Sequence, residues 1–366
     1  MIITDLIEAI EHALAFDFAS ITPQKVEKAL NQERLELTDL GALLSPAAEA
    51  YLEPMAQKAR QLTKNFFGQV ITLFTPLYLA NFCVNHCLYC GFNQRNPLRR
   101  GALSPTEIER ELATIKAQGF QDILLLTGES RGHSGPDYLE AAVKLAAPSF
   151  ASVGLEVYPL KTPEYARLQK AGADYVCVYQ ETYQPQLYDQ IHPQGPKKNY
   201  LWRLMAPARA LQAGVRGVGL GVLLGLGDFR GDTLAMAVHG QYLAQMSPAA
   251  DIAYSIPRLR PTPGTRAEFG QISEKELLQI ILALRIFSPS FGLSLSTRER
   301  AYFRDHVIGL GVTRLSAGVK TSVGGHSGPD QGDEQFLKSD DRDVNQVSEA
   351  IIARGHQPIF HDYARP

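Results

Sequence analysis

Three cysteines lie within eight residues of this chain, in the segment Cys83-Val-Asn-His-Cys87-Leu-Tyr-Cys90. The spacing CxxxCxxC puts three soft thiolate ligands on one short loop. A structural zinc site normally takes four ligands, so three thiolates without a nearby fourth leave one coordination position open. The segment therefore predicts a metal centre at which chemistry takes place.

Other metal arrangements fit this segment less well. His86 lies next to Cys87 and cannot easily turn to the same ion, so we interpret it as a solvated loop histidine. Cys177 lies in the apolar run Tyr175–Tyr179, which indicates a buried strand, and we interpret it as a small core residue. The remaining alternative is a non-enzymatic zinc or iron–sulfur protein. That alternative predicts a fourth protein ligand.

Short β-branched or apolar runs alternate along the chain with segments of helical periodicity. Eight such steps over about 250 residues predict an α/β fold, a closed (β/α)₈ TIM-type barrel, whose ligand sites lie at the carboxyl ends of the strands. The predicted strands are Ile71–Leu79, Asp122–Thr127, Val153–Tyr158, Tyr175–Tyr179, Gly217–Leu224, Ile252–Ile256, Gly292–Ser296 and Thr313–Ser316. The predicted helices between them include Pro105–Gln118, Pro163–Lys170, Tyr200–Ala213, Thr233–Met246 and Glu274–Phe287.

Segments on either side of the barrel have their own patterns. Residues 1–70 are amphipathic, so we expect an N-terminal helical extension that caps the bottom of the barrel or packs on its side. Residues 71–320 are expected to form the barrel. Residues 321–366 are expected to form a C-terminal lid, which glycines make mobile, and a helix at Val344–Arg354.

The composition is that of an intracellular enzyme. The chain has 366 residues, a formal net charge of −2, 45% hydrophobic and 20% charged residues, enough for one large α/β domain with additions. There is no basic excess to indicate nucleic-acid binding and no long apolar stretch to indicate a membrane. The first residues lack the basic region of a signal peptide, so we expect a cytoplasmic protein with reduced thiols.

The cysteine segment, with Tyr89 before its last cysteine, resembles the signature of the radical S-adenosylmethionine (SAM) enzymes. The resemblance implies a 4Fe-4S cluster held by Cys83, Cys87 and Cys90, whose fourth iron is ligated by the amino and carboxylate groups of SAM. Reduction of the cluster would cleave SAM to methionine and a 5′-deoxyadenosyl radical. Tyr89 is expected among the residues that bind the cofactor.

The same resemblance assigns further residues to SAM. Thr127-Gly128-Glu129 resembles the glycine-rich motif whose backbone receives the SAM amino group. Glu156 and Tyr158 alternate on the third predicted strand, where a buried carboxylate needs a partner because leaving its charge unpaired costs several kcal/mol. SAM hydroxyls or its ammonium would suit Glu156, and a salt bridge to Arg203 is an equal alternative. Arg203 is also a candidate for the SAM carboxylate, and Glu181 is assigned to the cofactor as well.

Six more segments carry a closer resemblance: Leu77–Asn81, Leu126–Glu129, Val178–Tyr183, Leu220–Leu226, Ser255–Pro261 and Leu295–Glu299. With them, nearly the whole chain from about residue 70 onward is similar to the aromatic amino-acid lyase branch of the radical SAM superfamily, in particular the tyrosine lyases of thiazole biosynthesis. This implies cleavage of the Cα–Cβ bond of L-tyrosine, giving 2-iminoacetate (dehydroglycine) and p-cresol, for the thiazole moiety of thiamine. The implied partners are thiazole synthase and a flavodoxin- or ferredoxin-type reductant.

The resemblance also assigns substrate residues. Arg298 is the candidate clamp for the tyrosine carboxylate, because a guanidinium binds a carboxylate through two parallel hydrogen bonds. Ser316 would accept from the amino group, and Tyr78 would help to position it near the cluster. A tryptophan lyase remains an alternative. A hydrogenase-maturation lyase of the same branch carries a second cluster held by further cysteines, whereas this chain has no cysteine after Cys177.

Overall fold

The computed structural model describes residues 3–262 and 269–361, and its central sheet closes into the predicted barrel. The barrel strands are β1 (Val70–Ala80), β2 (Asp122–Thr127), β3 (Ser152–Glu156), β4 (Tyr175–Cys177), β5 (Gly217–Gly221), β6 (Asp251–Ser255), β7 (Gly292–Leu295) and β8 (Arg314–Ser316). Neighbouring strands are parallel in the order β2-β3-β4-β5-β6-β7-β8-β1, and β1 pairs with β2 to complete the ring. All eight predicted strands are confirmed, with ends that shift by a few residues.

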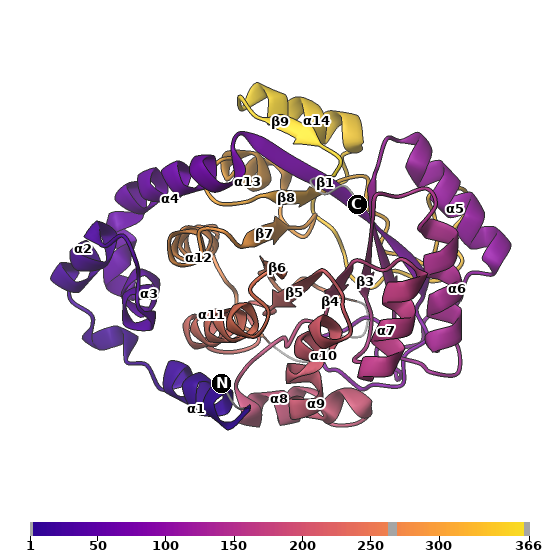
Figure 1. Ribbon diagram of the computed structural model, residues 1–366, viewed down its shortest axis with the longest axis horizontal. Coiled ribbons are helices and arrows are strands. Elements are labelled where there is room, and N and C mark those ends of the chain that lie inside the picture. Colours follow the sequence, from indigo (N-terminus) through magenta and orange to yellow (C-terminus); the bar gives the residue numbers. More distant parts are fainter. Residues whose placement is uncertain (1–2, 263–268, 362–366) are drawn as a thin grey trace.

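Helices follow the strands and surround the barrel (Figure 1). They are α5 (Pro105–Ala117), α6 (Pro136–Ala146), α7 (Thr162–Ala171), α8 (Pro185–Ile191), α9 (Tyr200–Leu204), α10 (Ala206–Gln212), α11 (Phe229–Met246), α12 (Glu274–Phe287) and α13 (Ala301–His306). The single helix predicted at Tyr200–Ala213 is two helices, because Pro207 has no N–H for the carbonyl of Arg203. Across the described parts of the chain, no helix is both long and apolar enough to cross a bilayer.

The strands separate an apolar outer layer from a more polar interior. On β3, Val153 and Leu155 pack in the main apolar core, which also contains the inward faces of the surrounding helices. The alternate residues Ser152, Gly154 and Glu156 line a cavity inside the barrel. This period of two is the normal alternation of a strand, and it lets one segment serve both the core and the site.

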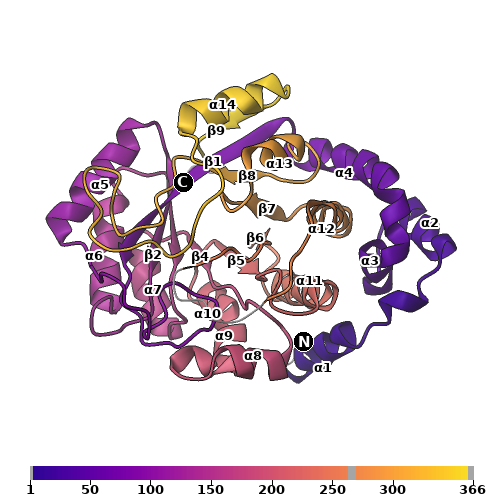
Figure 2. The same ribbon diagram turned by 180° about the vertical axis from the view of Figure 1, so that it is seen from behind.

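The N-terminal extension packs on the side of the barrel. It consists of α1 (Ile3–Leu14), α2 (Pro23–Asn31), α3 (Leu37–Leu44) and α4 (Leu52–Phe67), with short 3₁₀ turns at Phe18–Ser20 and Pro46–Tyr51. Helix α1 contacts α11, and α3 and α4 contact α12. In Figures 1 and 2 these helices form an arc outside α11 and α12. Of the two expected placements, the side is the one observed.

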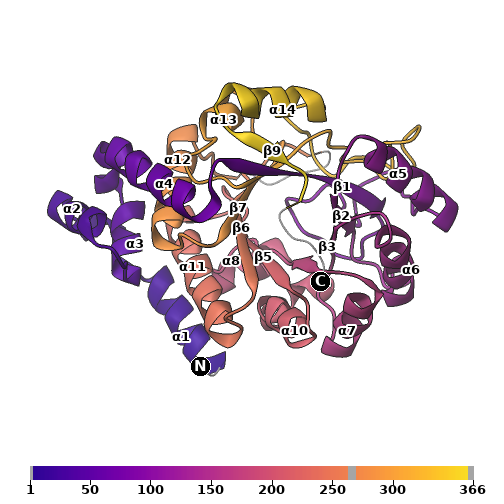
Figure 3. The ribbon, with the colours of Figure 1, turned by 45° about the horizontal axis from the view of Figure 1, so that its top comes forward.

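The C-terminal part returns to the first strand of the barrel. After β8, residues 317–343 form a long loop that we call the roof segment, followed by α14 (Val344–Ala353) and β9 (Gln357–Ile359). β9, which was not predicted, pairs in parallel with Val70–Thr72 of β1. Figure 3 shows β9 beside β1, with α14 next to β9. The residues expected to form a separate lid thus include a strand of the barrel sheet.

The roof segment is tied to α5 by a buried carboxylate. Glu111 is 5% exposed and accepts from the backbone N–H of His326 (2.8 Å) and of Ser327 (3.1 Å), and from the Ser327 hydroxyl. A charged acceptor with three donors makes strong hydrogen bonds. This one side chain therefore holds the glycine-rich start of the roof segment against the barrel.

We expect Glu111→Ala to loosen the roof segment. Loss of three hydrogen bonds to a buried carboxylate should lower the free energy of unfolding by about 2–3 kcal/mol. Chemical denaturation measures this loss, and limited proteolysis should show faster cleavage near residue 325. Glu109→Ala, an exposed position on the same helix, is the matched control. Equal stability and equal cleavage of the two variants would contradict this anchoring role.

Candidate active site

The three cysteines lie on the loop that follows β1, at the carboxyl end of the barrel. Cys87 is buried and the other two are partly buried. An amide donor lies beside each outer sulfur, with Asn85 Nδ2 3.7 Å from Cys83 Sγ and Gln335 Nε2 3.7 Å from Cys90 Sγ. Amide donors stabilise thiolate charge, as an iron–sulfur cluster requires. The donor set therefore fits the implied cluster.

The arrangement of the thiols differs from that of a single-ion site. Within residues 3–262 and 269–361, no three His, Cys, Asp or Glu side chains are grouped as ligands of one ion. A 4Fe-4S cluster does not require its ligands to share one ion, because each thiolate binds a different iron.

The turn after β2 holds the cysteine loop in place. Gly128 N–H donates to the carbonyl of Ala80 (2.9 Å), and Val84 N–H donates to that of Glu129 (2.9 Å). A Cβ at Gly128 would lie 2.4 Å from the carbonyl oxygen of Phe82, so glycine permits this close approach. The motif predicted to bind SAM through its backbone therefore also supports the cysteine loop.

A cavity extends from the cysteine loop into the barrel, reaching Asp122 and Ser152 at the starts of β2 and β3. The predicted site residues that line it are Tyr78, Tyr89, Cys90, Glu156, Glu181, Arg298 and Ser316. The predicted site residues outside its lining are Cys83, Cys87, Thr127, Gly128, Glu129, Tyr158 and Arg203. Thr127 Oγ1 is buried and has no hydrogen-bond partner in the described structure.

Arg298 presents a guanidinium without a carboxylate partner to this cavity. Its Cζ lies over the ring of Phe336, 3.5 Å from the ring centroid. Within the part of the chain that the structure describes, Arg298 forms no ion pair. Burial lowers the pKa of Arg298, while Tyr78 and the carboxylates of Glu181 and Glu156 act in the opposite direction. A desolvated guanidinium of this kind is suited to bind the carboxylate of a ligand.

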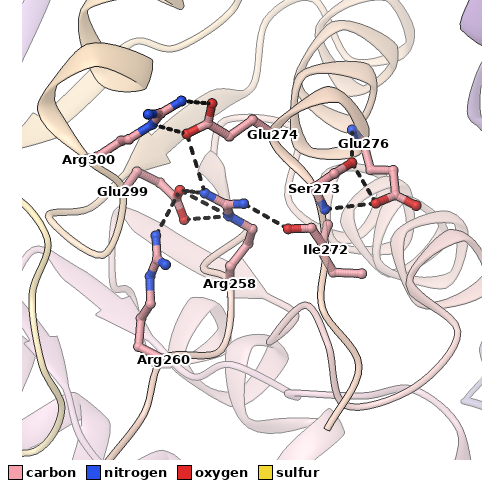
Figure 4. A network of polar contacts seen from close by, with 8 residues as sticks. All are labelled: Arg258, Arg260, Ile272, Ser273, Glu274, Glu276, Glu299 and Arg300. Atoms are coloured by element: carbon pink, nitrogen blue, oxygen red, sulfur yellow. Dashed lines mark hydrogen bonds and ion pairs between the residues drawn. The ribbon is translucent and has the colours of Figure 1, made fainter.

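A polar network fixes the backbone next to Arg298 (Figure 4). Glu299 is 1% exposed and accepts from both Arg258, with Nε 3.0 Å away, and Arg260 (3.2 Å). Arg258 also donates to the carbonyl of Ile272, just before α12 (2.7 Å). The network thereby joins the loops that follow β6 and β7. We infer that this network keeps Arg298 in its position at the cavity wall.

The other two predicted substrate residues already have protein partners. The Tyr78 hydroxyl donates to Gln335 Oε1 (2.8 Å), and Ser316 Oγ accepts from the N–H of Thr297 (3.2 Å). Both side chains are nearly fully buried at the cavity wall. Their contacts with a substrate stay predictions.

Glu181 is the centre of a buried charge cluster. It pairs with Lys197 (2.7 Å) and with Arg203 (3.7 Å), and all three side chains are at most 13% exposed. Burial alone would raise its pKa, but Lys197 and Arg203 together lower it, so the carboxylate is ionised. Its φ of 73° is the sole positive φ of a non-glycine among the described residues. Such strain is typical of functional sites.

Lys197 was not predicted from the sequence, although it lines the cavity. Burial raises the pKa of the Cys87 thiol, and Lys197 counteracts this. Its ammonium also lies 5.4 Å from the centroid of the Tyr89 ring. The only sequence signal was the pair Lys197-Lys198 after a Gly-Pro turn, which is common on protein surfaces.

His192 is a second residue that the sequence analysis missed. Its Nε2 is 2.8 Å from the Tyr89 hydroxyl, and its Nδ1 is 2.8 Å from the carbonyl of Tyr188. Because a carbonyl only accepts, Nδ1 carries the proton and Tyr89 donates to Nε2. Burial, together with Lys197 and Arg203, lowers the pKa of His192 to about 2. The neutral imidazole thus fixes the orientation of Tyr89.

Glu156 and Tyr158 have different surroundings. Glu156 lines the cavity and accepts from the Tyr179 hydroxyl, whereas Arg203, its predicted alternative partner, pairs with Glu181. Tyr158 packs in the main apolar core and donates to the carbonyl of Ser134 (2.8 Å). The strand ends at Glu156, so the alternation does not continue to Tyr158. Contact between Tyr158 and SAM stays a prediction that the cavity does not support.

Comparison with known proteins shows the family. Residues 77–237 match the model of the radical SAM superfamily, and residues 255–357 match the Biotin and Thiamin Synthesis associated domain. The chain is 42% identical to 2-iminoacetate synthase of Escherichia coli K12 over 343 residues, which cover 93% of this chain and 91% of that protein. The chain belongs to the 2-iminoacetate synthase family. Membership in this family of radical SAM enzymes implies SAM and an iron–sulfur cluster as cofactors.

This member of the 2-iminoacetate synthase family is also similar to solved structures of other proteins. The [FeFe]-hydrogenase maturase HydG from Carboxydothermus hydrogenoformans is 31% identical, with a TM-score of 0.90, and the match covers 99% of this chain and 86% of that one. Methylornithine synthase (PylB) is 23% identical, with a TM-score of 0.73 over 92% of this chain and 97% of that one, and shares the fold. The overall fold of this chain is therefore shared with these structures.

We expect Glu156→Gln to stabilise the protein at pH 8. Burial and the nearby Glu181 raise the pKa of Glu156 from 4.5 to about 7. Between these values the unfolded chain is ionised and the folded protein is protonated, so stability falls as pH rises from 4.5 and the loss is complete above 7. At pH 8 the substitution should raise the free energy of unfolding by about 2 kcal/mol. One pKa unit corresponds to 1.36 kcal/mol, and solvent in the cavity screens part of the cost of burying the ionised carboxylate.

Chemical denaturation of the protein without cofactors measures this gain. It should be present at pH 8 and absent near pH 4.5. Glu109→Gln, on the exposed face of α5, should change stability at neither pH. A gain from Glu156→Gln that is the same at both pH values would disprove the raised pKa.

Proposed function

We propose that this protein is the tyrosine lyase of its family, a radical SAM enzyme that cleaves the Cα–Cβ bond of L-tyrosine to give 2-iminoacetate and p-cresol. The observation that carries the proposal is the unpaired Arg298 in the cavity that Cys90 borders. A carboxylate-binding group and a cluster ligand then face the same space. The 42% identity to 2-iminoacetate synthase supports the choice of reaction.

The cofactors would be held at the carboxyl end of the barrel. Cys83, Cys87 and Cys90 would bind the 4Fe-4S cluster, and Thr127 would offer its unpartnered hydroxyl to SAM. Once bound, the cluster and SAM would supply a 5′-deoxyadenosyl radical, the hydrogen-abstracting species that the reaction needs. Glu181, flanked by Lys197 and Arg203, would orient the cofactor.

The protein's own contribution is to position tyrosine. Arg298 would bind the carboxylate through two N–H groups, and Phe336 keeps its guanidinium plane fixed by stacking. Tyr78 and Ser316, which line the same cavity, would contact the amino group. Positioning matters because a displacement of about 1 Å can cost a hundredfold in rate.

The protein also has to exclude water from the product. An imine hydrolyses readily, and the roof segment covers the cavity with Val319, Gln335 and Phe336. Enclosure of a reactive intermediate is a general role of such covers. We extend the proposal to a cytoplasmic protein that receives electrons from a flavodoxin- or ferredoxin-type reductant and passes 2-iminoacetate to thiazole synthase.

An anaerobic assay tests the function. Protein reconstituted with iron and sulfide is given dithionite, SAM and either tyrosine or tryptophan, and 5′-deoxyadenosine and the aromatic fragment are measured. We expect p-cresol from tyrosine and its loss in Cys87→Ala, which should also lose iron. Cys177→Ala, outside the cluster loop, should keep its iron. Deoxyadenosine with cleavage of tryptophan alone would reject the tyrosine assignment.

We expect Arg298→Lys and Arg298→Ala to weaken tyrosine binding. A hydrogen-bonded charge pair contributes about 1.5–3 kcal/mol, so KM for tyrosine should rise about tenfold to a hundredfold. Arg110→Ala, at an exposed position on α5 that does not line the cavity, is the control. An unchanged KM in Arg298→Ala would show that another group binds the carboxylate.

A further inference from the structure

Gln335 contacts both the substrate side and the cluster side of the cavity. It lies in the roof segment, 245 residues from Cys90 in the sequence. Its Oε1 accepts from the Tyr78 hydroxyl (2.8 Å), and its Nε2 lies 3.7 Å from Cys90 Sγ. One amide therefore bridges a residue predicted to contact the substrate and a residue predicted to bind the cluster.

The chemistry of the three groups fixes the orientation of this amide. A metal-bound thiolate has no proton, so it can only accept a hydrogen bond. The NH₂ end of Gln335 must therefore face Cys90, since the opposite orientation would place two acceptors together. The carbonyl end then faces the phenol, and Tyr78 has to donate.

The backbone of Gln335 is held close to the cysteine loop. Its N–H donates to the carbonyl of Thr321 (3.0 Å), within the roof segment. Its own carbonyl oxygen would lie 2.1 Å from a Cβ at position 91, so Gly91 permits a contact that any other residue would block. A side chain anchored in this way has little freedom to leave Cys90.

We propose that Gln335 is a positioning residue that donates to the Cys90 thiolate, raises the reduction potential of the cluster, and makes that potential depend on Tyr78. The inference rests on the cluster of the proposed function. A hydrogen bond to a ligating sulfur withdraws negative charge from the cluster, which favours the reduced form. The roof segment thereby sets an electronic property of the cluster as well as covering it.

The test is the midpoint potential of the reconstituted cluster, measured with neither SAM nor tyrosine present. In Gln335→Ala the ratio of reduced to oxidised cluster at a fixed solution potential should fall about tenfold, which for one electron corresponds to ~59 mV. Gln335→Glu keeps the size of the side chain but replaces the donor by a negative charge, so its potential should fall at least as far. Gln331→Ala, at an exposed position in the same segment, should match the wild type.

Tyr78→Phe tests the second half of the proposal. Without the phenol the amide is less well oriented, so the potential should fall, though by less than in Gln335→Ala. In the double variant, Tyr78→Phe should add nothing, because its effect passes through Gln335. Additive effects of the two substitutions would reject this dependence.

Iron content and thermal unfolding identify variants that are damaged overall. If Gln335→Ala does not retain its iron, the comparison is made with Gln335→Glu. A wild-type potential in whichever variant retains full iron would overturn the proposal. Failure of the wild type to cleave tyrosine would refute the proposed substrate and leave the potential shift unaffected, so the two failures are distinguishable.

Discussion

The site depends on close contact between two backbones at the carboxyl end of the barrel. The loop after β1 lies against the turn after β2, joined by hydrogen bonds from Gly128 to Ala80 and from Val84 to Glu129. Contact at this distance is possible because residue 128 has no Cβ. β1 then places Tyr78 in the cavity, and Cys83 follows five residues later on the cysteine loop. Displacement of this contact would move the substrate side and the cluster side together.

Charged groups in the cavity and in the loops next to it differ in how they are paired. Glu181 is compensated by Lys197 and Arg203, and Glu299 by Arg258 and Arg260. These groups are paired within the protein, as buried charges must be. Arg298 differs from them, since it has an aromatic ring as its neighbour and no carboxylate partner among the described residues. The cavity is thus prepared for a ligand that brings its own negative charge.

Much of the architecture and part of the site could be predicted from sequence. The strands could be predicted from their alternation with helical segments, and the cysteine loop from three cysteines at fixed spacing, because both signals are local. Gln335 and Phe336 have no local signal, since they reach the cavity through a long loop whose path depends on tertiary contacts. The short strand β9 could not be predicted either, because it too depends on tertiary contacts and not on a local sequence pattern. Tyr158 shows the limit of alternation, which holds only as far as the strand continues.

The pairing of β9 with β1 has a consequence for the order of assembly. β1 begins at residue 70, whereas its partner begins at residue 357, so this contact is among the most distant in sequence. During synthesis from the N-terminus, the cysteine loop and all eight barrel strands emerge before the roof segment and β9. A long-range contact of this kind forms late, because closing the loop between its partners costs entropy. The nascent chain therefore passes through a stage in which Gln335 does not yet lie beside Cys90, so this thiol would be more accessible to a cluster-assembly machinery than in the folded protein.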